Sequence, residues 1–285
     1  MAKVTLTCST CGKTFQRYRS QIRGRVFCSH KCHSLSEQAK ELDESVFRFD
    51  TSTYTFEKPH PFLGNYDGVK LTSHSARKPY NYRIFEKGIH DELTAYLYGV
   101  ILTDGAIILS EEKRSNALVI KMKDKDIIEI ISNALKKKAI VVTGGKYHML
   151  QLRNNYLVHD LMALGCRPNK TENANYPLIP DELDKHFIRG CFDGDGSWVT
   201  SQKQNRYTVE NLRFFGNDLL LYGIYRKIKQ HLGVVPQKVQ YPREYKMRSF
   251  CRITYGQFAS YKIRDWLYEG ATYYGRRKYA KSMGV

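Results

Sequence analysis

The sequence predicts an α+β fold made of two similar halves, preceded by a small cysteine-rich module. Residues 93–105, LTAYLYGVILTDG, align with residues 184–196, DKHFIRGCFDGDG, at an offset of 91 residues. The same order of predicted elements follows each of these segments, and four cysteines at metal-like spacing lie within the first 32 residues. Because the repeat is longer than the period of solenoid proteins, we interpret it as a duplicated domain with pseudo-two-fold symmetry.

The composition favours a globular protein with a polyanionic partner. A hydrophobic content of 42% and a charged content of 26% exclude a disordered or low-complexity chain. Lys and Arg total 46 against 28 Asp and Glu, so the net charge of +18 points first to nucleic acid. No apolar run approaches the roughly 20 residues that span a bilayer, and the N-terminus has no apolar signal core. We therefore expect a soluble, intracellular protein with no membrane partner.

The first module, residues 1–36, contains the pattern C-x2-C-x16-C-x3-C. Four thiolates at this spacing can hold one zinc ion tetrahedrally, and the module has too few large apolar residues to fold without it. We expect a zinc-finger module with structural Zn²⁺, and His30 and His33 are substitute ligands of lower rank. The expected ligands are Cys8, Cys11, Cys28 and Cys32, whereas the scattered Cys166, Cys191 and Cys251 are expected to be small core residues.

Residues 37–90 form a predicted connector. The stretch 70–87 mixes basic residues with Tyr80, Tyr82 and Phe85. Such interleaving suits contact with a phosphate backbone. A solvated linker whose aromatic side chains dock on the next domain is an equally good interpretation.

The two halves are expected to span residues 91–180 and 181–285. In each half a helix is followed by a polar loop, a strand, a second helix, further strands and a third helix. Apolar residues three to four apart mark one buried face of each second helix. The predicted strands cover residues 117–123, 139–144 and 146–153, then 211–215, 238–242 and 249–255; the later helices cover residues 126–137, 155–165, 218–233 and 258–270.

Small residues recur on one face of the repeated first helix. Gly99 and Thr103 lie four residues apart, as do Gly190 and Gly194. A glycine inside a helix costs about 1 kcal/mol relative to alanine, so two matched copies need a packing reason. Direct contact between the two helix backbones supplies one. We therefore expect the repeated helices to pack against each other.

This packing would place Asp104 and Asp195 side by side at the C-terminal ends of both helices. Two carboxylates at the negative ends of two helix dipoles repel each other unless a cation binds. Oxygen ligands favour magnesium, and in a basic protein such a site suggests phosphodiester hydrolysis. A single Asp-Gly pair could simply end a helix, because glycine after the last turn is a common stop signal. The duplication argues against that simpler explanation.

The segments LYGVILTDG (97–105) and IRGCFDGDG (188–196) resemble the two motifs of LAGLIDADG homing endonucleases. The resemblance covers about residues 91–280 and implies a monomeric, pseudo-symmetric enzyme whose antiparallel sheets form a saddle over the DNA major grooves. It also implies that Asp104 and Asp195 hold Mg²⁺ or Mn²⁺ and that cleavage leaves short 3′ overhangs. At the sixth motif position the first copy has Leu102 and the second has Asp193, to which we assign a capping or packing role.

The resemblance also implies a basic residue near each active site. Lys170, 25 residues before Asp195, matches one such position, and Lys278 is its less certain counterpart. Lys123, at the end of a predicted strand, is an alternative in the first half. These lysines would stabilise charge at the scissile phosphate or polarise the attacking water.

Base recognition is expected from polar side chains that alternate along the strands, where Arg, Lys, Gln and Asn can pair with base edges in the major groove. The zinc module and the connector would extend this contact through tethering. The candidate DNA-binding residues are Lys121, Lys123, Gln151, Arg153, Lys203, Gln204, Arg206, Arg213, Gln237, Lys238, Gln240, Arg248 and Arg252.

The function expected from these features is site-specific cleavage of double-stranded DNA at a long recognition site, by an enzyme of an intron or phage mobile element. Its location would be the cytoplasm of a bacterial or phage-infected host, or an organelle. The alternative is an RNA maturase that binds intron RNA, or a DNA-binding regulator that does not cut, on the same scaffold. An intein is disfavoured because the chain opens with Met1 and lacks a terminal His-Asn.

Overall fold

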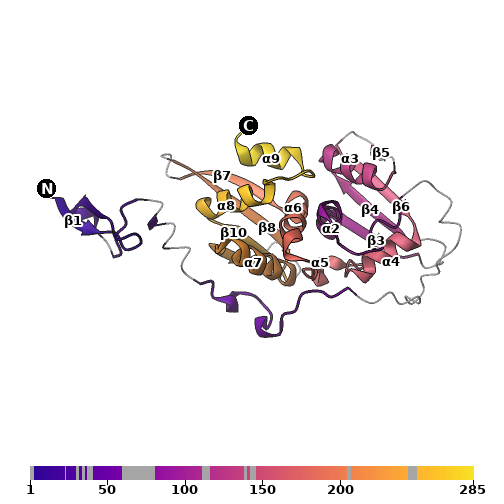
Figure 1. Cartoon of the computed structure of the whole chain (residues 1–285), viewed down its shortest axis with the longest axis horizontal. Coiled ribbons are helices and arrows are strands. Elements are labelled where there is room, and N and C mark those ends of the chain that lie inside the picture. Colours follow the sequence, from indigo (N-terminus) through magenta and orange to yellow (C-terminus); the bar gives the residue numbers. More distant parts are fainter. Residues whose placement is uncertain are drawn as a thin grey trace.

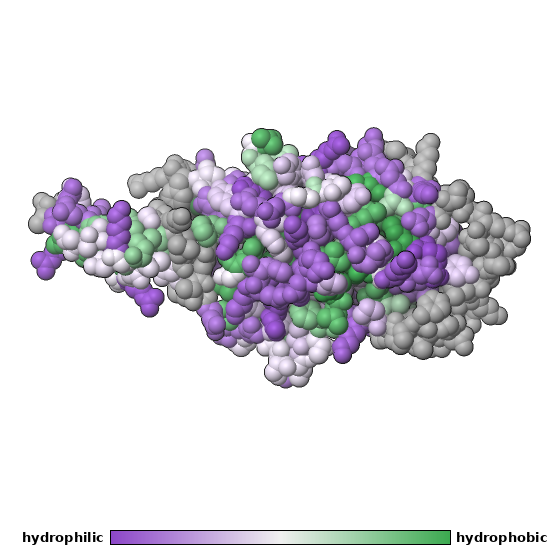
Figure 2. Space-filling view, in the orientation of Figure 1, coloured by the Kyte–Doolittle hydropathy of each residue, from purple (hydrophilic) through white to green (hydrophobic). Residues whose placement is uncertain are grey.

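The computed structural model describes residues 3–22, 24–29, 32–33, 36, 41–59, 81–110, 116–137, 140–141, 146–203, 207–242 and 249–285. Within these residues no helix is long and apolar enough to cross a membrane. Hydrophilic residues predominate on the face shown in Figure 2, and hydrophobic residues form smaller separate areas there.

Both halves follow the predicted order of helix, strands, helix, strands and helix, with one strand more after the motif helix than the sequence predicts. In both, a motif helix is followed by two strands, a helix, two strands and further helices. The first repeat contains α2 (Glu92–Asp104), β3 (Gly105–Ile108), β4 (Ala117–Met122), α3 (Lys125–Ala134), β5 (Ile140–Val141), β6 (His148–Arg153), α4 (Asn155–Ala163) and α5 (Lys170–Asn173). The second contains α6 (Asp184–Asp195), β7 (Ser197–Lys203), β8 (Tyr207–Asn217), α7 (Asp218–Leu232), β9 (Lys238–Gln240), β10 (Phe250–Tyr255), α8 (Gln257–Tyr268) and α9 (Arg276–Met283).

The two sheets have matching topologies. Their strand orders are β3-β4-β6-β5 and β7-β8-β10-β9, and every neighbouring pair is antiparallel. Figure 1 shows α2 and α6 side by side, with the strands of the first repeat on one side of this pair and those of the second on the other. The predicted duplicated α+β fold with antiparallel sheets is therefore confirmed.

The segment after each motif differs from the prediction of a polar loop. Strand β3 begins at Gly105, directly after α2, and β7 begins at Ser197, one residue after Gly196. Neither glycine adopts the left-handed conformation of a helix stop, because φ is −78° at Gly105 and −82° at Gly196. Space is the reason instead: a Cβ at Gly105 would lie 2.6 Å from the carbonyl oxygen of Ile101. The chain thus turns from helix into strand without a connecting loop.

Helix α2 is buried around most of its circumference, since its residues 94–102 are all buried. It begins with a capping box, in which Asp91 accepts a hydrogen bond from the backbone N–H of Thr94 at 2.8 Å and Thr94 accepts one in return. A helix that is buried on all sides packs between two other layers. For α2 these layers are the sheet of its own repeat, through β3 and β4, and helix α6 of the second repeat.

The described part of the connector docks on the protein. Residues 41–59, here called the strap, contain the short 3-10 turns η2 (Glu44–Val46) and η3 (Thr51–Thr53) and place Phe47 in the core. Tyr82 and Phe85 are also buried, which matches the docked-aromatic interpretation at these two residues. Tyr80 and the basic residues of 70–80 lie outside the described residues.

The N-terminal module is a two-stranded antiparallel hairpin of β1 (Lys3–Thr7) and β2 (Thr14–Tyr18), followed by the 3-10 turn η1 (Arg19–Gln21). Cys8 and Cys11 lie in the turn that joins the strands, where the backbone N–H of Gly12 donates to the Cys8 carbonyl oxygen at 3.0 Å. This turn brings the first cysteine pair together.

Candidate active site and nucleic-acid interface

The two motif helices touch through their backbones. A Cβ added at Gly99 would overlap the carbonyl oxygen of Phe187 and lie 2.8 Å from the backbone nitrogen of Cys191. One added at Gly190 would overlap the carbonyl oxygen of Tyr96. The Cα atoms themselves are near enough that either added Cβ would lie within 3.1 Å of the opposite glycine Cα. At these two glycines no side chain separates the two helix backbones.

The same contact continues to the aspartates. A Cβ at Gly194 would overlap the hydroxyl of Thr103 and lie 3.1 Å from the carboxylate oxygen Oδ2 of Asp104. Thr103 directs its hydroxyl back to its own helix, donating to the carbonyl oxygens of Gly99 and Val100 at 3.0 Å each. Asp104 and the last turn of α6 are thus in contact, as the helix model predicts.

Asp104 and Asp195 are the last residues of α2 and α6, and burial is the main cause that raises the pKa of each. Burial and then the negative charge of Asp195 raise the pKa of Asp104 to about 6. Burial also raises the pKa of Asp195, although the positive charges of Lys170 and Lys278 oppose that shift. Two carboxyl groups that resist joint ionisation provide a fit for a divalent cation, which would relieve their repulsion.

Two of the three predicted lysines lie at this site. Lys170 donates from Nζ to the carbonyl oxygen of Thr103 at 2.9 Å, and Lys278 donates to those of Phe192 and Gly194 at 2.8 and 2.6 Å. Both side chains are buried, and burial lowers the pKa of each. Each ammonium therefore binds the C-terminal carbonyls of a motif helix, within the electric field of both aspartates.

Lys123 is placed differently. Its side chain is exposed and its Nζ lies 5.6 Å from the ring centroid of Tyr147. After burial, the groups that act most on the pKa of Asp104 are the charges of Asp195, Lys278 and Lys170. The structure thus places Lys123 on the exposed surface directly after β4, beside Tyr147.

Asp193 has the packing role predicted for it. It accepts hydrogen bonds from the hydroxyl of Tyr96 at 3.0 Å and from the backbone N–H of Gly275 at 2.6 Å. Gly275 directly precedes α9, the helix that carries Lys278. The carboxylate therefore helps to hold that helix against the motif pair.

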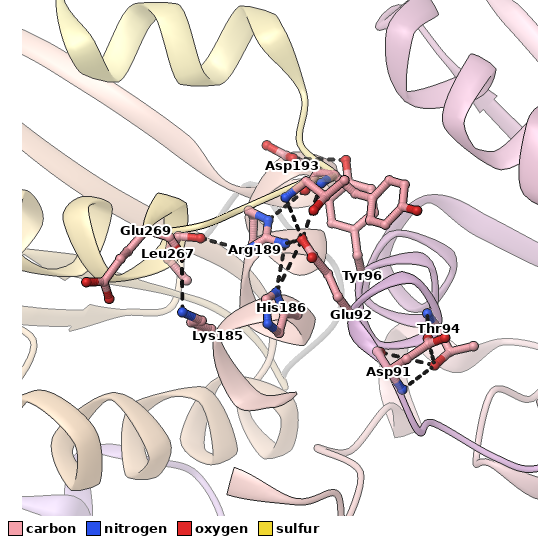
Figure 3. A network of polar contacts seen from close by, with 12 residues as sticks. Asp91, Glu92, Thr94, Tyr96, Lys185, His186, Arg189, Asp193, Leu267 and Glu269 are labelled. Atoms are coloured by element: carbon pink, nitrogen blue, oxygen red, sulfur yellow. Dashed lines mark hydrogen bonds and ion pairs between the residues drawn. The ribbon is translucent and has the colours of Figure 1, made fainter. Parts of the chain in front are cut away.

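A buried ion pair that the sequence analysis did not predict links the two motif helices (Figure 3). Arg189 on α6 is fully buried and donates to Glu92 on α2 at 2.6 Å. It also donates to the carbonyl oxygens of Leu267 and Tyr273, at 2.6 and 2.7 Å. Arg189 thus joins α2, α6 and the segment leading into α9. The only signal in the sequence is a charged residue beside the motif glycine.

The four cysteines of the module form a cluster whose sulfur atoms all lie within 4.8 Å of one another. The Sγ of Cys28 lies 3.6 Å from that of Cys11 and 3.5 Å from that of Cys32. These distances fit a tetrahedral site, in which Zn–S bonds of about 2.3 Å separate the sulfur atoms by about 3.8 Å. Although burial opposes ionisation of the Cys8 thiol, hydrogen bonds from the backbone N–H groups of Cys11, Cys28 and Thr10 lower its pKa to about 6.

The other cysteines and the substitute ligands can also be placed. His33 packs its ring against Phe27, with the centroids 5.0 Å apart, and is not in the sulfur cluster. His30 lies outside the described residues. Cys166, Cys191 and Cys251 are buried, as expected of core residues.

The outer face of the second sheet gathers predicted DNA-binding residues. Arg252 donates to Gln240 at 2.7 Å, and burial together with the charge of Arg252 lowers the pKa of Arg213. The Nε atoms of both arginines are buried and have no hydrogen-bond partner among the described residues. Arg213 borders a recess of about 330 Å³ whose lining also includes Asn211, Gln237, Lys238, Gln240 and Thr254. This recess offers several donors and acceptors to a polar ligand.

The outer face of the first sheet carries Lys121, Gln151 and Arg153 on alternate positions of β4 and β6. Lys121 and Arg153 are exposed and Gln151 is half-buried. Lys203 lies at the end of β7, but nothing of its side chain is described. Gln204, Arg206 and Arg248 lie outside the described residues.

No protein-family model matches the chain, and no curated protein matches it. The solved structure of I-SmaMI, a LAGLIDADG homing endonuclease bound to cleaved DNA, is 10% identical, with a TM-score of 0.46 over 68% of this chain and 87% of that one. I-GzeII in complex with its DNA target is 11% identical, with a TM-score of 0.44 over 66% and 86%.

Variants of the homing endonuclease I-DmoI are 18% identical, with a TM-score of 0.45 over 62% of this chain and 94% of theirs. The solved structures to which this chain is similar are thus LAGLIDADG homing endonucleases.

Proposed function

We propose that the protein is a site-specific endonuclease that cuts double-stranded DNA with a divalent metal ion. The observation that carries the proposal is the pairing of Asp104 and Asp195 at the ends of two helices in backbone contact. Two buried lysines beside the acids, basic and amide side chains on the sheets and a net charge of +18 suit a phosphodiester substrate. The resemblance of both motifs to LAGLIDADG sequences supports the same assignment.

The carboxylates of Asp104 and Asp195 would hold Mg²⁺ or Mn²⁺, which supplies an acidified water and charge stabilisation at the scissile phosphate. The protein's own part is to fix the donors around that phosphate. Lys170 uses one of its three N–H groups on a carbonyl oxygen and Lys278 uses two, so both retain donors for phosphate oxygens. Because carbonyl contacts hold both ammonium groups in place, little reorganisation is needed as negative charge develops.

The duplex would lie on the outer faces of the two sheets. Arg213 and Arg252, whose Nε atoms have no hydrogen-bond partner in the described chain, would pair with guanine edges in the major groove. We propose the same kind of contact for Lys121, Gln151 and Arg153 on the first sheet, and Zn²⁺ bound by the four cysteines as the structural centre of the N-terminal module. The short 3′ overhangs and the monomeric state also belong to this proposal.

The test begins with selection of a bound duplex from a randomised DNA library in Ca²⁺, followed by transfer of the enriched duplex to Mg²⁺ or Mn²⁺. We expect the wild-type protein to cut both strands. Asp104→Asn and Asp195→Asn should each reduce the cleavage rate by at least about a hundredfold while changing duplex affinity only a few-fold. Glu129→Gln is the matched control, because that carboxylate is exposed on α3 and pairs with the neighbouring Lys125 at 3.0 Å.

Cleavage at the wild-type rate by both Asp→Asn variants would contradict the assignment of the site. Preference for structured intron RNA over every selected duplex, with no DNA cleavage in either metal, would instead favour the RNA maturase.

A further inference from the structure

The strap is anchored on the second repeat by a half-buried polar contact. The carboxylate of Glu44 accepts hydrogen bonds from the hydroxyls of Tyr222 and Tyr225 on α7, at 2.5 and 3.0 Å. These partners lie 178 and 181 residues away in the sequence. Hydrogen bonds to a charged group are stronger than those between neutral groups, so this contact fixes the beginning of the strap on α7.

Aromatic packing reinforces the anchor. Phe47 is only 3% exposed, and its ring lies 5.0 Å from that of Tyr222. The guanidinium of Arg48 lies 3.9 Å from the ring centroid of Tyr241, whose hydroxyl accepts a hydrogen bond from the Arg48 backbone at 3.0 Å. Tyr241 directly follows β9, the strand that carries Lys238 and Gln240. The strap therefore begins next to the candidate DNA-binding face of the second repeat.

The anchor limits where the N-terminal module can lie. Eight residues lie between Cys32 and Glu41, where the strap begins. At about 3.3–3.6 Å per residue they span at most about 30 Å, or the length of about nine base pairs. Figure 1 shows α7 and β10 on the far side of the α2–α6 pair from the first repeat. The module is thus tethered to the second repeat.

Charge distinguishes the module from the strap. Residues 1–36 contain 7 Lys and Arg and no Asp or Glu, whereas the strap contains 5 acidic and 2 basic residues. With Zn²⁺ and four thiolates included, the module still has a net charge of 7 − 4 + 2 = +5. Among its described cationic residues, Lys3, Lys13, Arg19 and Arg25 are exposed. The positive charge of the module therefore favours contact with a polyanion, whereas the acidic strap binds helix α7 through Glu44.

We propose that the four-cysteine module binds the DNA duplex flanking the half-site under the second repeat, so that the bound segment extends further on that side than on the other. The inference rests on the proposed function, because it assumes that a duplex lies along the sheets. Its chemistry is phosphate contact by exposed Lys and Arg held on a zinc-stabilised hairpin. The resulting contact depends on salt and not on base sequence.

Hydroxyl-radical footprinting of the full-length protein on the selected duplex, in Ca²⁺, tests the inference. The half-sites are first assigned with Arg252→Ala and Arg153→Ala, which should relax base preference under the second and first repeats respectively. The wild-type footprint should then extend beyond the Arg252 half-site by up to about ten further base pairs and end sooner beyond the other.

Two variants separate the module's fold from its charge. Cys8→Ser should lose zinc, measured by mass spectrometry, together with the flanking protection, while central protection persists. The triple variant Lys13→Gln/Arg19→Gln/Arg25→Gln should keep its zinc, lose the flanking protection, and reduce the salt dependence of binding by about three ions. Ser9→Ala, an exposed change in the same turn, should match the wild type.

Flanking protection that survives both variants, or that lies beyond the Arg153 half-site, would overturn this inference and leave the proposed function standing. Asymmetric protection without any cleavage in Mg²⁺ or Mn²⁺ would support the inference and contradict the proposed function. The absence of any footprint for the wild-type protein would overturn both.

Discussion

The backbone contact between α2 and α6 makes Gly190→Ala an informative substitution, because two effects predict opposite signs. Helix propensity alone predicts that alanine stabilises α6 by about 1 kcal/mol. The added Cβ would, however, overlap the carbonyl oxygen of Tyr96 and lie 3.0 Å from the backbone nitrogen of Val100. Both obstacles are main-chain atoms inside a helix, so no side-chain rotation can relieve the overlap.

The size of the effect follows from this geometry. Restoring an ordinary carbon–oxygen contact requires the two helices to separate by about 1 Å. Overpacking of this kind costs about 1–3 kcal/mol, which exceeds the gain in helix propensity. The free energy of unfolding should therefore fall. Because a misplacement of about 1 Å at reacting groups can cost a hundredfold in rate, cleavage should fall further than stability alone explains.

Urea denaturation followed by circular dichroism measures the first effect, and single-turnover cleavage of the selected duplex in Mg²⁺ measures the second. Gly216→Ala in β8 is the matched control, because a Cβ there would lie 3.6 Å from the nearest side-chain atom of Leu221 and should be tolerated. A Gly190→Ala protein that is more stable than the wild type and cuts equally fast would refute the argument that the glycines exist for backbone contact.

Three further substitutions probe the surroundings of the site. Arg189→Leu leaves the carboxylate of Glu92 without its buried partner, so the free energy of unfolding in urea should fall by about 3–5 kcal/mol, and a loss below 1 kcal/mol would contradict the role of this ion pair. Burial and the charge of Arg189 lower the pKa of His186 to about 4, so the unfolded chain binds more protons between about pH 4 and 6.5 and stability should rise with pH across that window. His186→Gln should flatten this rise, whose slope is at most about 1.4 kcal/mol per pH unit, and an unchanged slope would assign it to other groups. Lys170→Met and Lys278→Met should each slow cleavage at least about a hundredfold with little loss of duplex affinity, and strand-resolved kinetics that match the wild type would exclude a role in the chemistry.

The helix pair could be predicted because its cause is local and repeated. A glycine five residues before each aspartate lowers the stability of the helix, and close packing of two helices explains why it is kept. The second copy, at a fixed offset of 91 residues, shows that the pattern is not a coincidence. Strands β3 and β7 were harder to predict. Their first residues look like a polar loop after an Asp-Gly stop, and only the structure shows glycine serving a direct helix-to-strand turn.

The network around Arg189 could not be predicted from pattern, since its partner Glu92 lies 97 residues away in the sequence. The same holds for Glu44 in the strap, whose tyrosine partners lie far along the chain in the second repeat. Lys170 and Lys278 were predicted through the resemblance to a family, since a lone lysine carries no local sign of burial. Long-range polar contacts of this kind depend on how the halves dock and not on periodicity.

The direct passage from α2 into β3 has a mechanical consequence for the proposed enzyme. Asp104 ends the helix and the next residue, Gly105, opens a strand of the sheet on which DNA would rest, so no hinge separates the acid from that surface. A duplex seated out of register on the strands would carry its phosphates away from the carboxylates by the same displacement. Discrimination against poorly matched DNA would then require no conformational change, because such a duplex would not bring its scissile phosphates to the carboxylates.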